Sequence, residues 1–335
     1  MKIAVDAMGG DYAPKEIVLG AAKAAELYDI EVILVGDETK IKSCLPAKYM
    51  SDNRITISPT TEIIEMDDHV DAIRRKKDSS LVVCANMVKN GQADAMVGVG
   101  NTAATMSVAT LYIGRIPGIH RPAISTLFPG KINPSMILDL GAVADCNVEN
   151  MIEFAYMGSI YTEKVCGNKN PKVAILSIGE EESKGNELVK NAHQKLKKCK
   201  GLNFIGNIEG RQIFDSYADV IVCDGFSGNV LLKVVEGMFN FVKDFFKEKM
   251  SRNKLFYIPA MMMLPIYKGL KKLADYSEYG GAPLLGINGV CIIGHGRSNA
   301  KAVCNAVKVA KNCVENDLVG SIKTAIDELN KKSEN

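Results

Sequence analysis

The sequence predicts an α/β fold with three layers, Rossmann-like, in which the sheet is mostly parallel. Two observations predict it. Short apolar runs rich in β-branched residues alternate with longer stretches of helical periodicity along the whole chain. Glycine-rich turns recur where these runs end, which is typical of strand–turn–helix units in an open sheet. Ligands of such sheets bind beyond the carboxyl ends of the strands, so we expect the turns to share one rim.

The expected elements follow in chain order. The apolar runs are too short for helices and long enough for buried strands. Strands are expected at residues 3–5, 31–35, 55–57, 95–97, 123–128, 136–140, 173–178, 204–205, 220–223 and 290–293. Helices with one apolar face are expected after the intervening turns, including one from 147 to about 164 and one from about 230 to about 250. A single long amphipathic helix is expected to close the chain.

The domain organisation follows from a change in composition. Residues 1–245 together with 280–335 are expected to form the α/β body, and residues 246–279 a projecting apolar helical hairpin. The apolar run at 255–267 is too short to span a bilayer, and Pro259 and Pro265 would break a single long helix. With the lysines that follow it, the segment 255–272 suits contact with a membrane surface. The alternative is burial between subunits or against the body.

Composition excludes several classes of protein. The net charge of +2, the absence of tryptophan and the 6% of aromatic residues argue against a nucleic-acid partner. Nine cysteines without a CxxC pair are best explained as reduced thiols in a cytoplasmic protein. The chain starts directly with a strand, so no signal peptide is expected.

Several turns carry polar groups suited to binding an anion. The stretch 219–237 reads as a strand, the turn 224–229 and the start of a helix, where unpaired backbone N–H groups and the helix dipole favour phosphate or an oxyanion. The alternative is an ordinary turn with Ser227 or Asn229 as the helix cap. Polar groups of the other turns are Asn101, Thr102, Lys184, Asn186 and His295.

Common catalytic motifs are absent from the sequence. No turn gives the full dinucleotide fingerprint, since Ala103 stands where its third glycine would be, and there is neither a GxxxxGK[ST] loop nor a GxSxG elbow. Cys146 and Cys223 are conceivable nucleophiles, but core packing is the alternative for each. An anion site of backbone N–H groups, one lysine and several amides remains.

Motifs from end to end of the chain resemble a known family. They are residues 5–11 (VDAMGGD), 100–102, 138–141 with 145–146, 157–161, 178–188, 223–230 (CDGFSGNV), 279–289 and 295–296. In this order they resemble the acyl-carrier-protein:phosphate acyltransferases of bacterial phospholipid synthesis (the PlsX type). Ala103, where we expect glycine, and Arg297, where we expect a small hydroxyl residue, depart from the pattern.

The resemblance implies an activity and partners. The activity is transfer of a long acyl chain from the thioester of acyl-carrier protein to inorganic phosphate, giving acyl phosphate. The resemblance also implies a homodimer, no metal or cofactor, and a fold similar to phosphate acetyltransferase and isopropylmalate dehydrogenase. The product would pass to a downstream membrane acyltransferase, so the protein is expected at the inner face of the cell membrane.

Roles for residues follow from the resemblance together with the chemistry. Lys184 is expected to neutralise phosphate, and Asn229 with the N–H groups of residues 225–229 to bind the oxyanion or phosphate. His295 is the third catalytic candidate. The alternative for Lys184 is a solvated loop lysine, and the alternative for His295 is a structural, hydrogen-bonded imidazole. The expected substrate-binding residues are Asp6, Gly9, Gly10, Asn101, Thr102, Asn186, Asp224, Gly225, Ser227 and Gly228.

Acyl-carrier proteins are acidic, so basic surface is expected to dock the donor. The candidates are residues 74–77 (RRKK), Lys268, Lys271, Lys272 and Arg297. Two competing hypotheses remain open on the sequence. One is a nucleotide-dependent oxidoreductase on a similar fold, and the other is a non-catalytic scaffold at the membrane surface.

Overall fold

The computed structural model describes residues 1–65, 67–68, 71–252 and 280–333. Within these ranges the strands form one sheet in the order β3-β2-β1-β4-β11-β10-β5-β6-β9-β7-β8. The strands are β1 (Lys2–Asp6), β2 (Glu31–Gly36), β3 (Ile55–Pro59), β4 (Ala95–Gly100), β5 (Ala123–Phe128), β6 (Ser135–Leu138), β7 (Lys172–Ser177), β8 (Asn203–Glu209), β9 (Val220–Val222), β10 (Ala282–Leu285) and β11 (Val290–His295).

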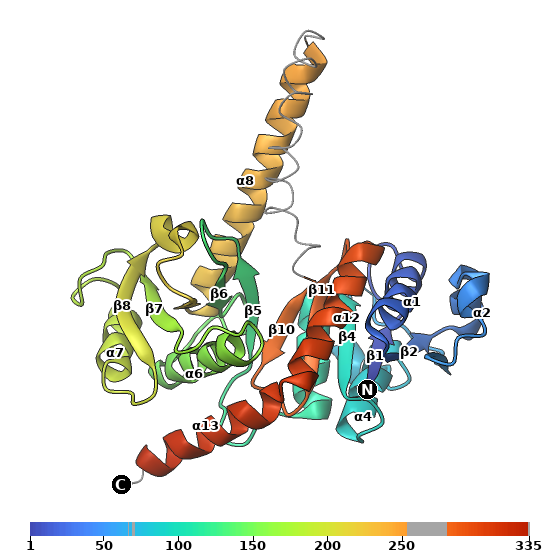
Figure 1. Ribbon diagram of the computed structural model, residues 1–335, viewed down its shortest axis with the longest axis horizontal. Helices are drawn as coiled ribbons and strands as arrows, with labels where there is room; N and C mark the ends of the chain where they lie inside the picture. Colours follow the sequence, from blue (N-terminus) through green and yellow to red (C-terminus); the bar gives the residue numbers. More distant parts are fainter. Residues whose placement is uncertain (66, 69–70, 253–279, 334–335) are drawn as a thin grey trace.

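Helices cover both faces of this sheet, so the predicted three-layer α/β fold class is confirmed (Figure 1). The described helices are α1 (Lys15–Tyr28), α2 (Glu38–Cys44), α3 (Asp71–Arg75), α4 (Ser80–Lys89), α5 (Thr102–Val108), α6 (Val148–Lys164), α7 (Glu187–Leu196), α8 (Gly225–Arg252), α12 (Ala300–Glu315) and α13 (Leu318–Ser333). A π-helical turn (Ala109–Ile113) continues α5, and 3₁₀ turns lie at Ala47–Tyr49 and Gly210–Asp215.

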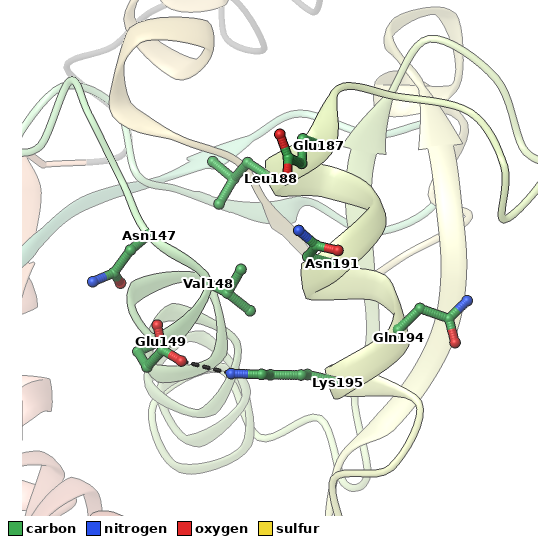
Figure 2. A pocket seen from close by; sticks show the side chains of 8 residues that line it. All are labelled: Asn147, Val148, Glu149, Glu187, Leu188, Asn191, Gln194 and Lys195. Carbon is green, nitrogen blue, oxygen red and sulfur yellow. Dashed lines mark hydrogen bonds and ion pairs between the residues drawn. The ribbon is translucent and has the colours of Figure 1, made fainter.

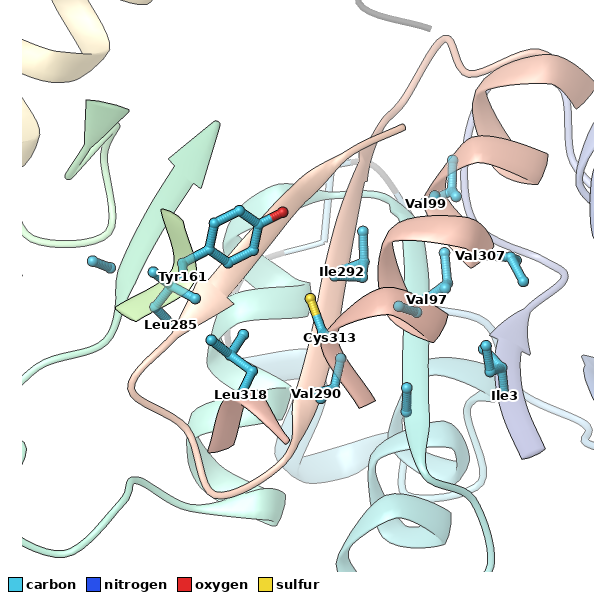
Figure 3. Close-up of a cluster of buried hydrophobic side chains, with 14 of the residues drawn as sticks. Ile3, Val97, Val99, Tyr161, Leu285, Val290, Ile292, Val307, Cys313 and Leu318 are labelled. Atoms are coloured by element: carbon cyan, nitrogen blue, oxygen red, sulfur yellow. The ribbon is translucent and has the colours of Figure 1, made fainter. Parts of the chain in front are cut away.

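The core follows from the two-residue period of the strands. In β1, Ile3 and Val5 belong to the apolar cluster under α1 and α12, whereas Ala4 belongs to the cluster under α4 on the other face. Figure 3 shows Val97 of β4 beside Val307 of α12 in the first cluster, with Ile3 of β1 nearby. Because both faces are buried, the strands read as continuous apolar runs in the sequence.

The sheet consists of two parallel halves that are joined by antiparallel strands. Strands β1 to β4 and β11 are parallel, and so are β6, β9, β7 and β8. Between them, β10 is antiparallel to β11 and to β5, and β5 is antiparallel to β6. The strands of one half therefore run opposite to those of the other half. Their carboxyl ends lie at opposite edges of the sheet, so the prediction that all the turns share one rim is wrong.

The joining strands explain why that expectation failed. Only residues 129–134 connect β5 to β6, which is too short for a parallel crossover and typical of a hairpin. The sequence around β10 is rich in glycine and proline, and no strand was expected there. Pairing of Leu284 with Ile124 and of Pro283 with Ile292 makes it a strand, which is an effect of tertiary structure over local propensity.

Helix α8 projects away from the sheet (Figure 1). It continues through residue 245, where the body was expected to end, up to Arg252. One of its faces, which carries Leu231, Leu232 and Val235, packs on the core. The rest of the expected hairpin, the membrane segment 255–272 and Lys268, Lys271 and Lys272 lie outside the described residues. None of the described helices is both long enough and apolar enough to cross a membrane.

The chain ends in two helices rather than the expected single one. Helix α12 stops at Glu315, and Asp317 has a φ of 44°, a left-handed conformation that interrupts helical hydrogen bonding. Asn and Asp adopt this conformation more readily than most residues, so Asn316-Asp317 is a usable stop signal. Helix α13 then packs on α6 in the other half of the molecule.

Candidate active site

A cleft of about 990 Å³ opens between the two halves of the sheet. Its walls come from the β4–α5 junction, the end of β11 and the residues that follow it, strand β5, the residues that follow β6, and one face of α8. Four of the predicted site residues line it: Asn101, Thr102, Asn229 and His295. The structure therefore brings together polar groups from three turns that are far apart in the sequence.

The cleft also has an apolar part. It is lined by Leu127, Phe128 and Leu140 from the β5–β6 hairpin and its end, and by Leu232, Val235 and Phe239 from α8. Apolar walls next to a small number of polar groups are typical of sites that bind a small molecule. The cleft can hold a ligand with a polar head and an apolar chain.

Asn101 begins helix α5. Its side-chain oxygen accepts a hydrogen bond from the N–H of Ala104 at 3.0 Å, which caps the helix. Its amide nitrogen donates to the carbonyl oxygen of Asp68 at 3.3 Å. Asn101 thus shapes this wall, and the next residue, Thr102, is exposed in the cleft.

His295 ends β11, opposite Gly100 of β4. Its Nδ1 accepts a hydrogen bond from the N–H of Arg297 at 3.1 Å, so a neutral ring carries its proton on Nε2. The Ser298 hydroxyl donates to the His295 carbonyl oxygen at 2.6 Å and closes the turn. The turn therefore holds the imidazole by a hydrogen bond, which is what the alternative of a structural histidine predicts. His295 also lines the cleft.

The start of α8 differs from the prediction. Asp224 caps the helix, not Ser227 or Asn229, because its Oδ1 accepts from the Ser227 N–H at 2.9 Å. The Gly228 N–H donates to the Asp224 carbonyl, and the Gly225 N–H donates to Val143 O at 3.0 Å. Three of the five N–H groups expected to bind the oxyanion or phosphate, those of residues 225, 227 and 228, are therefore engaged within the protein.

Gly225 and Gly228 permit close packing of the α8 start against residues 139–143. A methyl group on Gly225 would overlap the carbonyl oxygen of Val143, and one on Gly228 would overlap that of Asp139. Gly141, with a φ of +125°, brings the same loop beside Asn229. These glycines therefore fix where Asn229 lies in the cleft.

Asp139 organises this loop and was not among the predicted site residues. The carboxylate is fully buried and accepts backbone N–H groups from Ile124, Gly141, Ala142 and Val143. Burial raises the pKa of the Asp139 carboxyl, and the hydrogen bonds from these N–H groups oppose that rise. The carboxylate thus connects β5 to residues 141–143 through hydrogen bonds and fixes this wall of the cleft.

The first glycine turn has a similar structural role. Asp6 is buried, accepts from the Met8 N–H and the Ser80 hydroxyl, and has a pKa raised by burial. A methyl group on Gly9 would overlap the carbonyl oxygen of Val99, and Gly10 has a φ of +98°. Of this turn it is Asp11 that lines the cleft.

Lys184 and Asn186 lie outside the cleft lining. They belong to the loop that follows β7, and β9 separates β7 from β6 in the sheet. Asn186 caps α7 by accepting from the Val189 N–H at 2.9 Å, and Lys184 is exposed. The structure therefore does not place these two residues with Asn229 and His295.

The two cysteines considered as nucleophiles are poorly suited to that role. Burial raises the pKa of Cys146 to about 11, and that of Cys223 well above its ordinary value. The Cys223 thiol donates to the carbonyl oxygen of Asp139 at 3.4 Å. The thiolate, which is the nucleophilic form, is scarce at neutral pH in both, in agreement with core packing. Within the described part of the chain, no group of three or more His, Cys, Asp or Glu residues could hold a metal ion.

Two charged cleft residues on α8 were not predicted from the sequence. Lys233 and Glu236 line the cleft and form an ion pair of 3.0 Å. A signal was present, since Lys233 follows Asn229 by four residues and so shares its helix face. Arg297, expected to dock the donor, also lines the cleft, with its Nε 3.7 Å from an Asp11 carboxylate oxygen.

A second, more open groove of about 580 Å³ lies between the start of α6 and α7 (Figure 2). Glu149 and Lys195 face each other across it and form an ion pair of 2.6 Å. No residue predicted to bind substrate lines this groove. The cleft beside α8 is therefore the candidate active site.

Solved structures with related folds are acyl-transfer and dehydrogenase proteins. A phosphotransacetylase from Streptococcus pyogenes has a TM-score of 0.64 and 19% identity, and 94% of each chain is covered. A 4-hydroxythreonine-4-phosphate dehydrogenase from Klebsiella pneumoniae has a TM-score of 0.55 and 12% identity, covering 93% of this chain and 99% of that one. At such identities the likeness concerns the fold alone.

Sequence relatives are much closer. The phosphate acyltransferase of Desulfitobacterium hafniense (strain DSM 10664 / DCB-2) is 50% identical over 325 residues, which cover 96% of this chain and 97% of that protein. The phosphate acyltransferase of Heliobacterium modesticaldum is 48% identical over 328 residues, covering 97% and 98%. A family model described as "Fatty acid synthesis protein" matches residues 1–320. The chain therefore belongs to this family, which is that of the PlsX-type phosphate acyltransferases.

Proposed function

We propose that the protein is a phosphate acyltransferase that moves a long acyl chain from the thioester of acyl-carrier protein to inorganic phosphate. The observation that carries the proposal is the cleft itself, in which polar groups of three turns adjoin an apolar wall. The polar end suits phosphate and the thioester carbonyl, and the apolar wall suits the acyl chain. The names of the sequence relatives support the same reaction class.

The proposed reaction balances without a cofactor. An oxygen of hydrogen phosphate attacks the thioester carbonyl carbon, the C–O bond forms and the C–S bond breaks. The phosphate proton passes to the leaving sulfur, so acyl phosphate and a free thiol result. Because a thiol has a pKa of about 8.5, it leaves without a strong acid. The protein must hold two anionic reactants together and stabilise the tetrahedral oxyanion.

Asn229 and His295 are the proposed donors to the oxyanion. Among the described residues the Asn229 amide makes no hydrogen bond, so it is available to a ligand in the cleft. A neutral His295 would donate from Nε2, because Nδ1 accepts from the Arg297 N–H. Thr102 adds a hydroxyl on the facing wall. The predicted catalytic role of Lys184, and the predicted substrate-binding roles of the residues outside the lining, stay predictions.

Product analysis tests this proposal. The purified chain, incubated with acyl-acyl-carrier protein and phosphate, should form acyl phosphate, which hydroxylamine traps as a hydroxamate. Omitting phosphate should abolish the signal, and a nicotinamide cofactor should have no effect on it. Release of free fatty acid alone, or a cofactor-dependent change of redox state, would instead support a hydrolase or the oxidoreductase hypothesis.

The acidic donor is proposed to dock beside α5. Helix α3 packs on α5. The side chains of Arg74 and Arg75 on this helix are exposed, and so is that of Lys77, which follows it. Lys76 is instead engaged with Asp68 and the carbonyl oxygen of Ile63. Since contacts between exposed charges are screened by salt, the same assay should show an apparent KM for the donor that rises with salt. A salt-independent KM would remove this patch from the proposal.

The proposed homodimer would use the outer face of α8. Six apolar side chains repeat along this face at helical spacing and are 47–68% exposed: Phe226, Val230, Val234, Met238, Phe241 and Phe245. A stripe of this length is unusual on a monomer surface and typical of an interface. Two copies of one helix face are self-complementary about a twofold axis, so a second chain is the proposed occupant.

Charge placed on this stripe should separate the dimer. We expect Val234→Glu with Phe241→Glu to sediment as a monomer in analytical ultracentrifugation, since the carboxylates would be buried unpaired at the interface. Leu27→Glu, which changes an equally exposed apolar residue on α1, is the matched control and should remain dimeric. A double variant that is still dimeric, or a wild-type chain that is monomeric, would contradict the α8 interface.

The proposed location is the cytoplasm, at the inner face of the membrane, where a membrane acyltransferase would take up the product. Its sequence support is the apolar segment 255–272, which is outside the described residues. Flotation with anionic vesicles tests it, and a Met262→Glu, Leu264→Glu variant that still floats would argue against this segment.

A further inference from the structure

The charges that line the cleft are already paired with one another. Lys233 faces Glu236 at 3.0 Å on the α8 wall, and Arg297 lies 3.7 Å from Asp11 on the facing wall. With a neutral His295, the formal charges of the described lining sum to zero. An anionic substrate therefore has to displace a carboxylate from one of the two cations.

Three of the backbone N–H groups at the start of α8 are already engaged within the protein. The N–H groups of Gly225, Ser227 and Gly228 donate to Val143 O and to the Asp224 oxygens. Asn229, next along the helix, supplies an amide but no charge. The positive charge that holds a phosphate dianion must come from a side chain.

Lys233 is the cation best placed to supply it. It follows Asn229 by four residues, so the two side chains lie on the same face of α8, and both line the cleft. Its side chain is 62% exposed, and its ion pair with Glu236 spans a single helical turn. Such a pair at a solvated surface is weak and exchanges readily for a doubly charged ligand.

We propose that Lys233 binds the phosphate substrate, and that Glu236 holds the ammonium group over the cleft until phosphate replaces it. This inference rests on the proposed acyltransferase function and names the cation of its phosphate site. Arg297 is less suited, because its own N–H fixes His295 and its guanidinium faces Asp11 on the same wall of the cleft. Lys184 lies outside the lining altogether.

Steady-state kinetics with phosphate as the varied substrate tests the assignment. Lys233→Met should raise the KM for phosphate about 10²-fold and leave the KM for the acyl donor within about twofold, since a charge-assisted contact to phosphate alone is lost. Lys233→Arg should recover much of the loss because it restores the charge. Glu236→Gln should lower the KM for phosphate, because the competing carboxylate is gone.

Controls separate a local effect from a general one. Lys243→Met removes another exposed lysine of α8 that lies outside the cleft lining, and it should match the wild type. Thermal melting should show all variants folded. The assignment is overturned if Lys233→Met keeps the wild-type phosphate KM while Lys184→Ala or Arg297→Met raises it.

A binding measurement distinguishes failure of this assignment from failure of the proposed function. Inorganic phosphate is titrated into the wild type and Lys233→Met, and followed by ³¹P NMR line broadening. Binding that Lys233→Met loses supports the assignment even if the wild type forms no acyl phosphate. Equal binding by both proteins would contradict it even if the wild type is fully active.

Discussion

Gly228→Ala is expected to destabilise the folded chain by about 3 kcal/mol, at the upper end for overpacking a buried site. The added methyl group would overlap the carbonyl oxygen of Asp139, which belongs to the backbone and cannot rotate away. The buried Asp139 carboxylate ties that segment to Ile124 and to residues 141–143, so the loop cannot shift alone. The variant should therefore lose the wall that positions Asn229, and with it activity.

Urea denaturation measures this effect as a lower midpoint with an unchanged slope. Gly210→Ala is the matched control, because a methyl group there would meet no atom within 4 Å. It should unfold within about 0.5 kcal/mol of the wild type, as is usual for surface changes. A Gly228→Ala variant as stable and active as this control would show that the α8 start does not pack as described.

Asn229→Ala should reduce turnover about 10²-fold or more, which is the usual effect of losing one donor to an oxyanion. The fold should persist, because the side chain is exposed in the cleft and makes no hydrogen bond among the described residues. The loss is expected in kcat rather than in the KM of either substrate, since the oxyanion develops only as the bond to phosphate forms.

Asn240→Ala provides the comparison for this loss. Asn240 has the same side chain, lies on the same helix and lines the same cleft, about 16 Å further along α8 at 1.5 Å per residue. It should retain near wild-type turnover. Equal losses in both variants would mean that the asparagines act through the shape of the cleft, and normal turnover in Asn229→Ala would remove it from the reaction.

Much of the fold could be predicted from the sequence because burial on both faces leaves a clear pattern. The run at 123–128 was expected as a strand and is β5, and the helix expected from 147 to about 164 is α6 with Asn147 as its cap. The direction of a strand, however, has no local signature. Only the short β5–β6 connection indicated an antiparallel pair, and the glycine-rich segment of β10 masked the strand that joins the two halves.

The candidate site could be predicted only in part, for a related reason. Asn101, Thr102, Asn229 and His295 sit at strand or helix ends, where turn chemistry marks them, and the structure gathers them in one cleft. Whether a backbone N–H group is available to a ligand depends on what packs against it. Val143 and Asp224 accept the hydrogen bonds of three N–H groups that were expected to bind an anion. A lysine in the middle of a helix, such as Lys233, has the sequence pattern of a solvated surface residue. Only the tertiary structure shows that its helix face lines a cleft.

Phosphate is proposed to bind in the cleft between the two halves of the sheet, beside α8. Crystals of the protein grown or soaked with inorganic phosphate and a non-reactive acyl-donor analogue test it most directly. We expect phosphate within hydrogen-bonding distance of the Lys233 ammonium, the carbonyl oxygen of the donor analogue beside the Asn229 amide, and the acyl chain against Leu232 and Phe239. Phosphate held instead by the loop that carries Lys184, with the cleft empty, would contradict it.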